Sequence, residues 1–104
     1  MADRRRAKEA CVSAIVALIH GVEGAYGISF PDFRGCVSGG TTVDEALRRG
    51  AATLASHIEA MSANGDPLPM IRDMAAITAD PDLAEDIAEA ISIAAIETDL
   101  PDDR

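Results

Sequence analysis

The amino-acid sequence predicts a small α+β domain with the element order β-β-β-α-(α)-β. Three observations support this fold: strand-like apolar runs at 12–20, 25–30 and 36–38, a capping sequence that opens a long helix at Thr42, and another strand-like run at 92–98. We expect one four-stranded sheet in the order 3-2-1-4, with the long helix packed on one face. A chain of 104 residues has the length of a single domain with a single core.

The first two strands form a predicted hairpin. Residues 12–20 are nearly all apolar and rich in β-branched side chains, which is typical of a central strand buried on both faces. A short loop with two glycines, at 21–24, leads into the second strand at 25–30. Alternation along the second strand places its large side chains on one face: Tyr26, Ile28 and Phe30.

The third strand is predicted to be short and to lie at a sheet edge. A Pro-Asp corner at 31–32 ends the second strand, because proline cannot donate to the ladder. Gly35 allows a tight return into 36–38, and the Gly-Gly pair at 39–40 is expected to break that strand. An exposed edge of this kind needs cover, so we expect a homodimer or a higher homo-oligomer.

The long helix has a clear start and end in the sequence. The Thr42 hydroxyl can accept from the N–H of Glu45, while the Glu45 carboxylate can reach back to the N–H of Thr42. Asn64 and Gly65 supply a carboxy-terminal cap. The apolar residues that recur at helical spacing form the face expected to pack on the sheet: Leu47, Ala51, Leu54, Ile58 and Met61.

After the helix, residues 67–69 begin an extended connection, and 70–77 are compatible with one or two helical turns. Asp80 followed by Pro81 is a good helix start. A helical crossover then leads to the last strand at 92–98. The right-handed crossover rule favours a parallel pairing of this strand with the first.

Charge and composition restrict the possible partners. The net charge of −9 argues against sequence-independent binding to nucleic acid, where lysine and arginine neutralise phosphates. The same charge suits a basic protein partner. Aromatic residues make up only 3% of the chain, so the core must be largely aliphatic. Arg4–Arg6 form a basic amino-terminal cluster, whereas the last quarter is rich in acids.

Metal, cofactor and export patterns are not found in the sequence. Cys11, Cys36, His20 and His57 have no metal-ligand spacing, so we expect no metal and no cofactor. The apolar run at 12–19 is too short to span a bilayer, and no cleavage-type site follows it. These observations predict a cytoplasmic protein with reduced thiols.

Catalysis is not expected. A metal-dependent nuclease needs several converging carboxylates, one of them typically on the first strand. The first strand, at 12–20, contains no acid. Asp32 is explained by the turn, Glu45 by the helix cap, and Asp99 would be alone at the end of the last strand.

The middle of the chain resembles the HicB family, the antitoxins of HicA–HicB toxin–antitoxin pairs. The resemblance rests on the F-P-D-F-R-G-C stretch at 30–36, a Gly-Thr turn at 40–41, the E-A-L helix start at 45–47, and Gly65 followed by P-L-P at 67–69. It implies a truncated ribonuclease-H-like sheet. It also implies a non-catalytic protein that binds and neutralises a small, basic, mRNA-cleaving HicA-type toxin.

The resemblance and the acidic charge together suggest contact residues for that partner. They lie in the motif loop, at the helix start and in the acidic quarter: Asp32, Phe33, Arg34, Glu45, Asp80, Asp82, Glu85 and Asp86. Other motif residues are expected to serve the fold, because they make turns, a strand end and caps: Phe30, Pro31, Gly35, Gly40, Thr42 and Gly65.

The expected organisation is a basic, flexible amino terminus at 1–10, one HicB-like domain at 11–100 and an acidic tail at 101–104. Many HicB proteins carry an additional DNA-binding segment, but no recognition helix is evident here, so we expect no DNA binding by this chain. The alternative function is a solitary module of the same fold that binds a small ligand or another protein without a toxin. A neighbouring gene for a small basic protein would favour the antitoxin.

Overall fold

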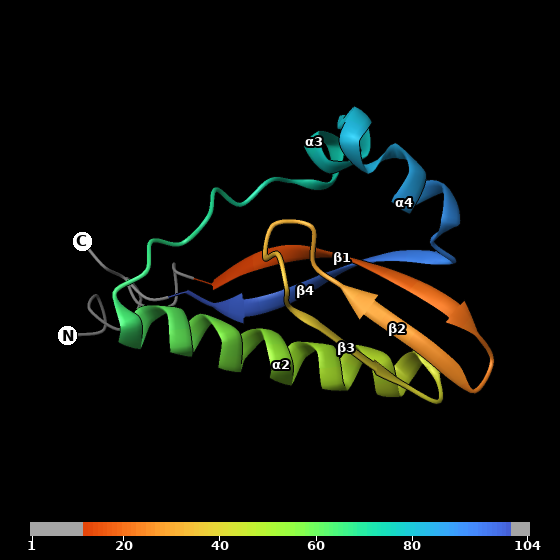
Figure 1. Cartoon of the computed structure of the whole chain (residues 1–104), viewed down its shortest axis with the longest axis horizontal. Helices are drawn as coiled ribbons and strands as arrows, with labels where there is room; N and C mark the ends of the chain where they lie inside the picture. Colours follow the sequence, from red (N-terminus) through yellow and green to blue (C-terminus); the bar gives the residue numbers. More distant parts are fainter. Residues whose placement is uncertain (1–11, 101–104) are drawn as a thin grey trace.

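The computed structural model describes residues 12–100 and places a four-stranded sheet between two helical layers (Figure 1). The expected basic amino terminus, Cys11 and the acidic tail lie outside the described residues. The elements are β1 (Val12–Val22), β2 (Ala25–Ser29), β3 (Val37–Gly40), α2 (Val43–Asn64), α3 (Met74–Ala79), the 3₁₀ helix η1 (Pro81–Leu83), α4 (Ala84–Glu89) and β4 (Ser92–Asp99).

The predicted strand order is confirmed, but the predicted direction of the last strand is wrong. The sheet order is β3-β2-β1-β4, and every neighbouring pair is antiparallel, including β1 with β4. The chain travels the length of the sheet twice between β3 and β4, first along α2 and then back over the opposite face (Figure 1). It therefore enters β4 beside the end of β1, with Ser92 opposite Ile19. The crossover rule describes a single helical return, whereas this connection has two legs.

The expectation that β1 is buried on both faces is confirmed. Ile15, Ala17 and Ile19 are at most 1% exposed and belong to the core under α2. Val16 and Leu18 alternate with them and are also buried. Their face is covered by residues 66–91, which we call the return segment; it includes α3, η1 and α4 (Figure 1).

The long helix begins as predicted, with one change of partner. Thr42 is the N-cap, and its hydroxyl accepts from the N–H of Glu45 at 3.0 Å. The Glu45 carboxylate, however, accepts from the N–H of Thr41 at 2.7 Å and from the Thr41 hydroxyl at 2.9 Å, rather than from Thr42. The helix ends at Gly65, which has a φ of 76° and donates to the carbonyls of Met61 and Ser62.

The helix approaches the sheet more closely than its apolar residues alone predict. The residues that α2 buries are Ala46, Gly50, Leu54 and Ile58. A Cβ on Gly50 would lie 2.8 Å from Cδ1 of Ile28 on β2, so only glycine fits this contact without a shift. The sequence interpretation included Leu54 and Ile58 but missed Gly50.

The third strand differs from the prediction at both ends. Cys36 precedes it and is buried, and burial raises the pKa of the Cys36 thiol. Gly39 and Gly40 were expected to break the strand but form its second half. A Cβ on Gly39 would collide with the carbonyl oxygen of Tyr26, and one on Gly40 would lie 2.8 Å from the backbone nitrogen of Ala46. These glycines let β3 pass close to β2 and to the start of α2.

Within residues 12–100, no helix combines the length and the apolar character needed to cross a membrane. The description of the sheet as a truncated ribonuclease-H-like fold stays a prediction.

Candidate partner-binding surface

The segment 30–36, which we call the motif loop, connects β2 to β3 through two successive turns. The N–H of Phe33 donates to the carbonyl of Phe30 at 2.9 Å, and the N–H of Cys36 donates to the carbonyl of Phe33 at 3.0 Å. Gly35 has a φ of 84°, a conformation that other residues rarely adopt. Phe33 and Cys36 are consequently buried, while Arg34 is exposed between them.

Phe33 was predicted to contact a partner, and the structure places its side chain mainly in the core of the domain. Its side chain is 2% exposed and packs edge-on against His57, with ring centroids 6.1 Å apart. In a chain with so few aromatic residues, a phenylalanine in this loop fills the domain's own core. Only a small part of Phe33 reaches the hollows beside the motif loop.

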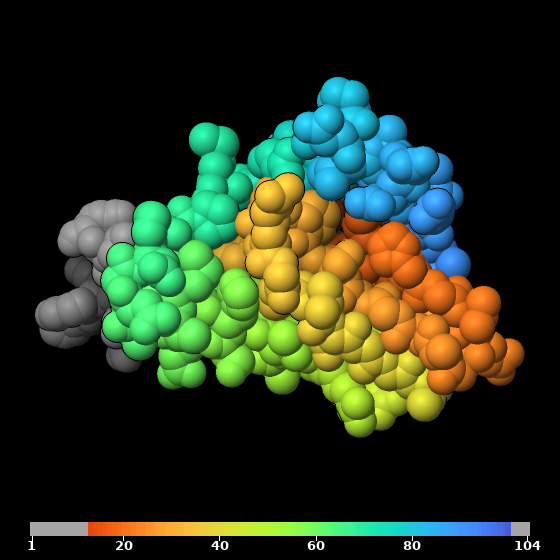
Figure 2. All heavy atoms as spheres, in the orientation of Figure 1, coloured from red at the N-terminus to blue at the C-terminus, as the bar shows by residue number. Residues whose placement is uncertain are grey.

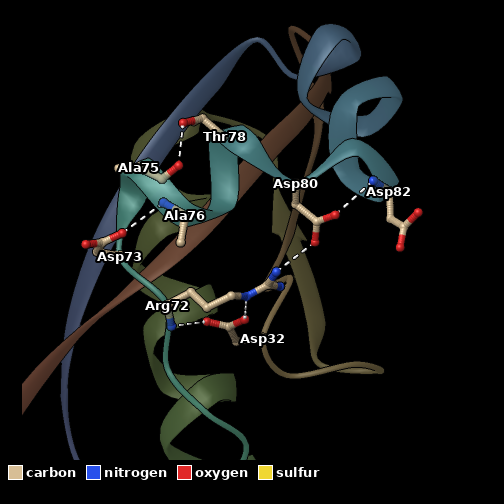
Figure 3. Close-up of polar contacts among 8 residues, drawn as sticks. All are labelled: Asp32, Arg72, Asp73, Ala75, Ala76, Thr78, Asp80 and Asp82. Carbon is tan, nitrogen blue, oxygen red and sulfur yellow. Dashed lines mark hydrogen bonds and ion pairs between the residues drawn. The ribbon is translucent and has the colours of Figure 1, made fainter.

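Asp32, also predicted to contact a partner, makes its hydrogen bonds within the domain. Its side chain is only 4% exposed, and both carboxylate oxygens face Arg72 of the return segment (Figure 3). One oxygen accepts from the backbone N–H of Arg72 at 2.8 Å, and the other accepts from Arg72 Nε at 2.7 Å. This contact fastens the return segment to the motif loop across 40 positions of sequence.

The same arginine reaches a second carboxylate. Arg72 Nη1 lies 2.7 Å from Oδ2 of Asp80, while Oδ1 of Asp80 accepts from the N–H of Asp82 at 2.9 Å and caps η1 (Figure 3). The Arg72 guanidinium, and after it the Asp82 N–H, lowers the pKa of Asp80. Hydrogen bonds to Asp32 and Asp80 raise the pKa of Arg72. We call Asp32, Arg72 and Asp80 the clasp.

Arg72 is the residue of this region that sequence reasoning missed. The available signal was weak: a lone cation within the stretch 67–79, followed by an acid-rich quarter. The sequence interpretation correctly placed Asp80 at a helix start, but it could not identify the cation that Asp80 pairs with. Asp73, a further unpredicted cap, accepts from the N–H of Ala76 at 2.8 Å at the start of α3.

The Glu45 carboxylate also makes its contacts within the domain. Besides its two bonds to Thr41, its carboxylate lies 3.2 Å from Nη2 of Arg49. The Thr41 N–H lowers the pKa of Glu45 most strongly, followed by the Thr41 hydroxyl and Arg49. A depressed carboxyl pKa means that the contacts favour the ionised form, so their stabilisation is present at neutral pH and is lost as the pH falls through the folded-state pKa.

Four of the predicted contact residues remain exposed: Arg34, Asp82, Glu85 and Asp86. Two hollows flank the motif loop. One, of about 350 Å³, lies towards α4 and brings Arg34 together with Leu83 and Asp86. The other, of about 290 Å³, lies on the side of α2 and the start of the return segment, where Arg34 meets His57 and Met61. Asp82 and Glu85 line neither of them.

The motif loop therefore forms a ridge between two hollows. Figure 2 shows it in amber, standing out between the teal and blue parts of the return segment. Arg34 contributes to the walls of both hollows. This shape offers a partner protein a cation and a nearby acid. Among residues 12–100, no three His, Cys, Asp or Glu side chains are grouped so that they could hold a metal ion.

A comparison with known protein families identifies the family of this chain. Residues 15–103 match the family described as the HicB-like antitoxin of bacterial toxin–antitoxin systems. The chain belongs to the HicB-like antitoxin family. Comparison with curated protein sequences gives no match.

Solved structures agree with the family. The N-terminal domain of the Burkholderia pseudomallei antitoxin HicB is 24% identical, with a TM-score of 0.69 over 85% of this chain and 100% of that one. A chain of a HicA3 and HicB3 toxin–antitoxin complex is 29% identical, with a TM-score of 0.67 over 84% and 99% of the two chains. A toxin–antitoxin complex from Streptococcus pneumoniae matches at 20% identity and a TM-score of 0.65, over 89% of this chain and 76% of that one.

Proposed function

We propose that this chain is a non-catalytic antitoxin that binds and neutralises a small, basic, RNA-cleaving toxin of HicA type. The observation that carries the proposal is the likeness to a chain of the HicA3 and HicB3 complex, at 29% identity over 84% of this chain. The family match over residues 15–103 supports the same conclusion. We further propose that residues 11–100 act as one domain in the cytoplasm, where the mRNA substrate of such a toxin is found.

The ridge of the motif loop is the surface we propose for the toxin. Arg34 and Asp86 meet at one hollow, and Asp82 and Glu85 extend the exposed acidic surface along η1 and α4. An RNA-binding toxin needs a basic surface, so a protein of charge −9 should meet it quickly through long-range attraction. Phe33 and Asp32 also line these hollows, but their low exposure leaves little of either side chain for contact with a partner.

Co-expression with a cognate toxin tests the proposal. The wild-type chain should restore the growth that the toxin alone arrests, and Glu85→Lys/Asp86→Lys should slow association with the toxin severalfold at low salt. The matched control is Glu23→Lys/Glu59→Lys, which makes the same charge change at exposed positions that line neither hollow of the ridge. If both variants slow association with the toxin equally, the ridge is not the toxin-binding site. Absence of both rescue and binding would favour the solitary module instead.

The outer edge of β3 is the surface we propose for self-association. Its residues are uncharged, and Val37 is 63% exposed. Two such edges can pair without bringing like charges together. Light scattering at micromolar concentration should give at least the mass of a dimer, and Val37→Lys should reduce it. A monomer mass for the wild-type chain would contradict this assignment.

A further inference from the structure

The two edges of the sheet differ in length and in charge. The edge strand β3 has four residues without a charged side chain, whereas the opposite edge strand, β4, has eight residues that include Glu97 and Asp99. Within residues 12–100, β4 pairs with β1 alone, so its other side presents backbone donors and acceptors that no described strand uses. Such an edge can accept an additional strand.

A groove runs between this edge and α2. Small side chains on the helix, Ala51 and Ala55, leave room beside the strand. Two hollows of about 400 and 330 Å³ adjoin there, and both include Ala55 and Asp99. We call them together the edge groove; the described residues that line it are Ala51, Ala55, Ile58, Glu59, Ser62, Glu97, Thr98 and Asp99. Its apolar part can hold the side chain of an added segment.

Charge restricts what could occupy the edge groove. Glu59, Glu97 and Asp99 are exposed acids, and none of the described lining residues is lysine or arginine. Phosphate groups of a nucleic acid would be repelled. A second copy pairing through the same edge would bring its own acids next to these. A segment with lysine or arginine would instead be attracted.

We propose that β4 and the edge groove bind an extended, lysine- or arginine-bearing segment of a partner protein, which adds to the sheet beside β4. The backbone of β4 would provide the pairing, and the groove would accommodate alternate side chains of the segment. The acids at the rim would favour basic residues. This surface lies at the opposite edge of the sheet from β3 and the motif loop, and the inference does not depend on the assignment of the ridge to a toxin.

A short synthetic peptide of alternating lysine and valine is the probe. Backbone amide exchange of the full chain should slow in β4 when the peptide binds, while the amides of β3 should not change. Affinity should fall as salt is raised, because the rim charges are exposed. Protection of β3 in place of β4, or no binding at millimolar peptide, would overturn the proposal.

Two pairs of matched variants separate the parts of the proposal. Ala55→Leu fills the edge groove on an exposed helical position and should weaken the peptide about tenfold, whereas Ala60→Leu, also exposed on α2 but outside the groove, should not. Glu97→Gln/Asp99→Asn should weaken binding and flatten its salt dependence, compared with the equally neutralising Glu23→Gln/Glu89→Gln. Equal effects of groove and control variants would show that the peptide binds by net charge alone.

Discussion

The two faces of the sheet are covered in different ways. On one face lies a single helix of 22 residues, α2, with a side-chain cap at its start, a glycine cap at its end and four buried residues. On the other face lies the return segment, in which α3 buries Ile77 alone, while η1 and α4 contain no fully buried residue. The first layer is held by apolar packing along its whole length. The second depends on a few apolar contacts and on the clasp.

This difference shows how a small domain can cover a sheet with little apolar material. A carboxylate buried without partners is costly, but Asp32 accepts from both the backbone N–H and Nε of Arg72, while Nη1 of the same guanidinium reaches Asp80. The guanidinium thus orders the motif loop, the extended start of the return segment and η1 relative to one another. Lysine has no planar fork and could not join these groups in the same way.

The largest effect should follow from removing a core side chain under α2. Leu54 is fully buried, and Leu54→Ala should lower the free energy of unfolding by about 3 kcal/mol through lost burial and a residual cavity. Denaturant unfolding measures this. The exposed position Ala60→Leu serves as a control with little expected change. A loss as small as that of a surface substitution would mean that α2 is not the main source of core stability.

Breaking the clasp should have a smaller and more local effect. Arg72→Ala removes the guanidinium bonds to Asp32 and Asp80 and leaves only the backbone N–H of residue 72 to donate to Asp32. Amides of α3 and η1 should therefore exchange severalfold faster, while those of α2 change little. Arg72→Lys keeps the charge and should give an intermediate result, because it loses the fork. Uniformly faster exchange in both layers would show that the two layers unfold as one unit, so that the return segment would not be the less stable of the two.

The smallest effect should come from the helix cap. Thr42→Ala removes the hydroxyl that accepts from the Glu45 N–H, and this should cost about 1 kcal/mol in denaturant unfolding. Thr41→Ala is the matched control; it keeps the backbone N–H that binds the Glu45 carboxylate and loses only the hydroxyl bond. We expect Thr41→Ala to cost less. An unchanged midpoint for Thr42→Ala would show that the cap is dispensable.

Most elements and the family could be predicted from the sequence because their signals are local. The strand order is also confirmed, although the parallel crossover from which it was argued is wrong. The buried pattern of β1, the threonine cap and the glycine at the end of α2 each act within a few residues, and the structure confirms them. The resemblance carried by residues 30–36, 40–41, 45–47 and 65–69 indicated the family that the match over 15–103 shows. These features depend on backbone propensity and periodicity, which a single sequence contains.

Other features were decided by tertiary contacts. The antiparallel direction of β4 follows from the return segment doubling back across the sheet, a path that no local pattern encodes. Gly50 is required by the approach of Ile28, and Phe33 is buried because the motif loop folds over the core. Arg72, the partner of Asp32, lies 40 positions away along the chain. The sequence therefore indicated that Asp32 is a turn residue and gave no sign of its ion pair. In each case the deciding contact joins segments far apart in the chain, and only the folded arrangement brings them within reach.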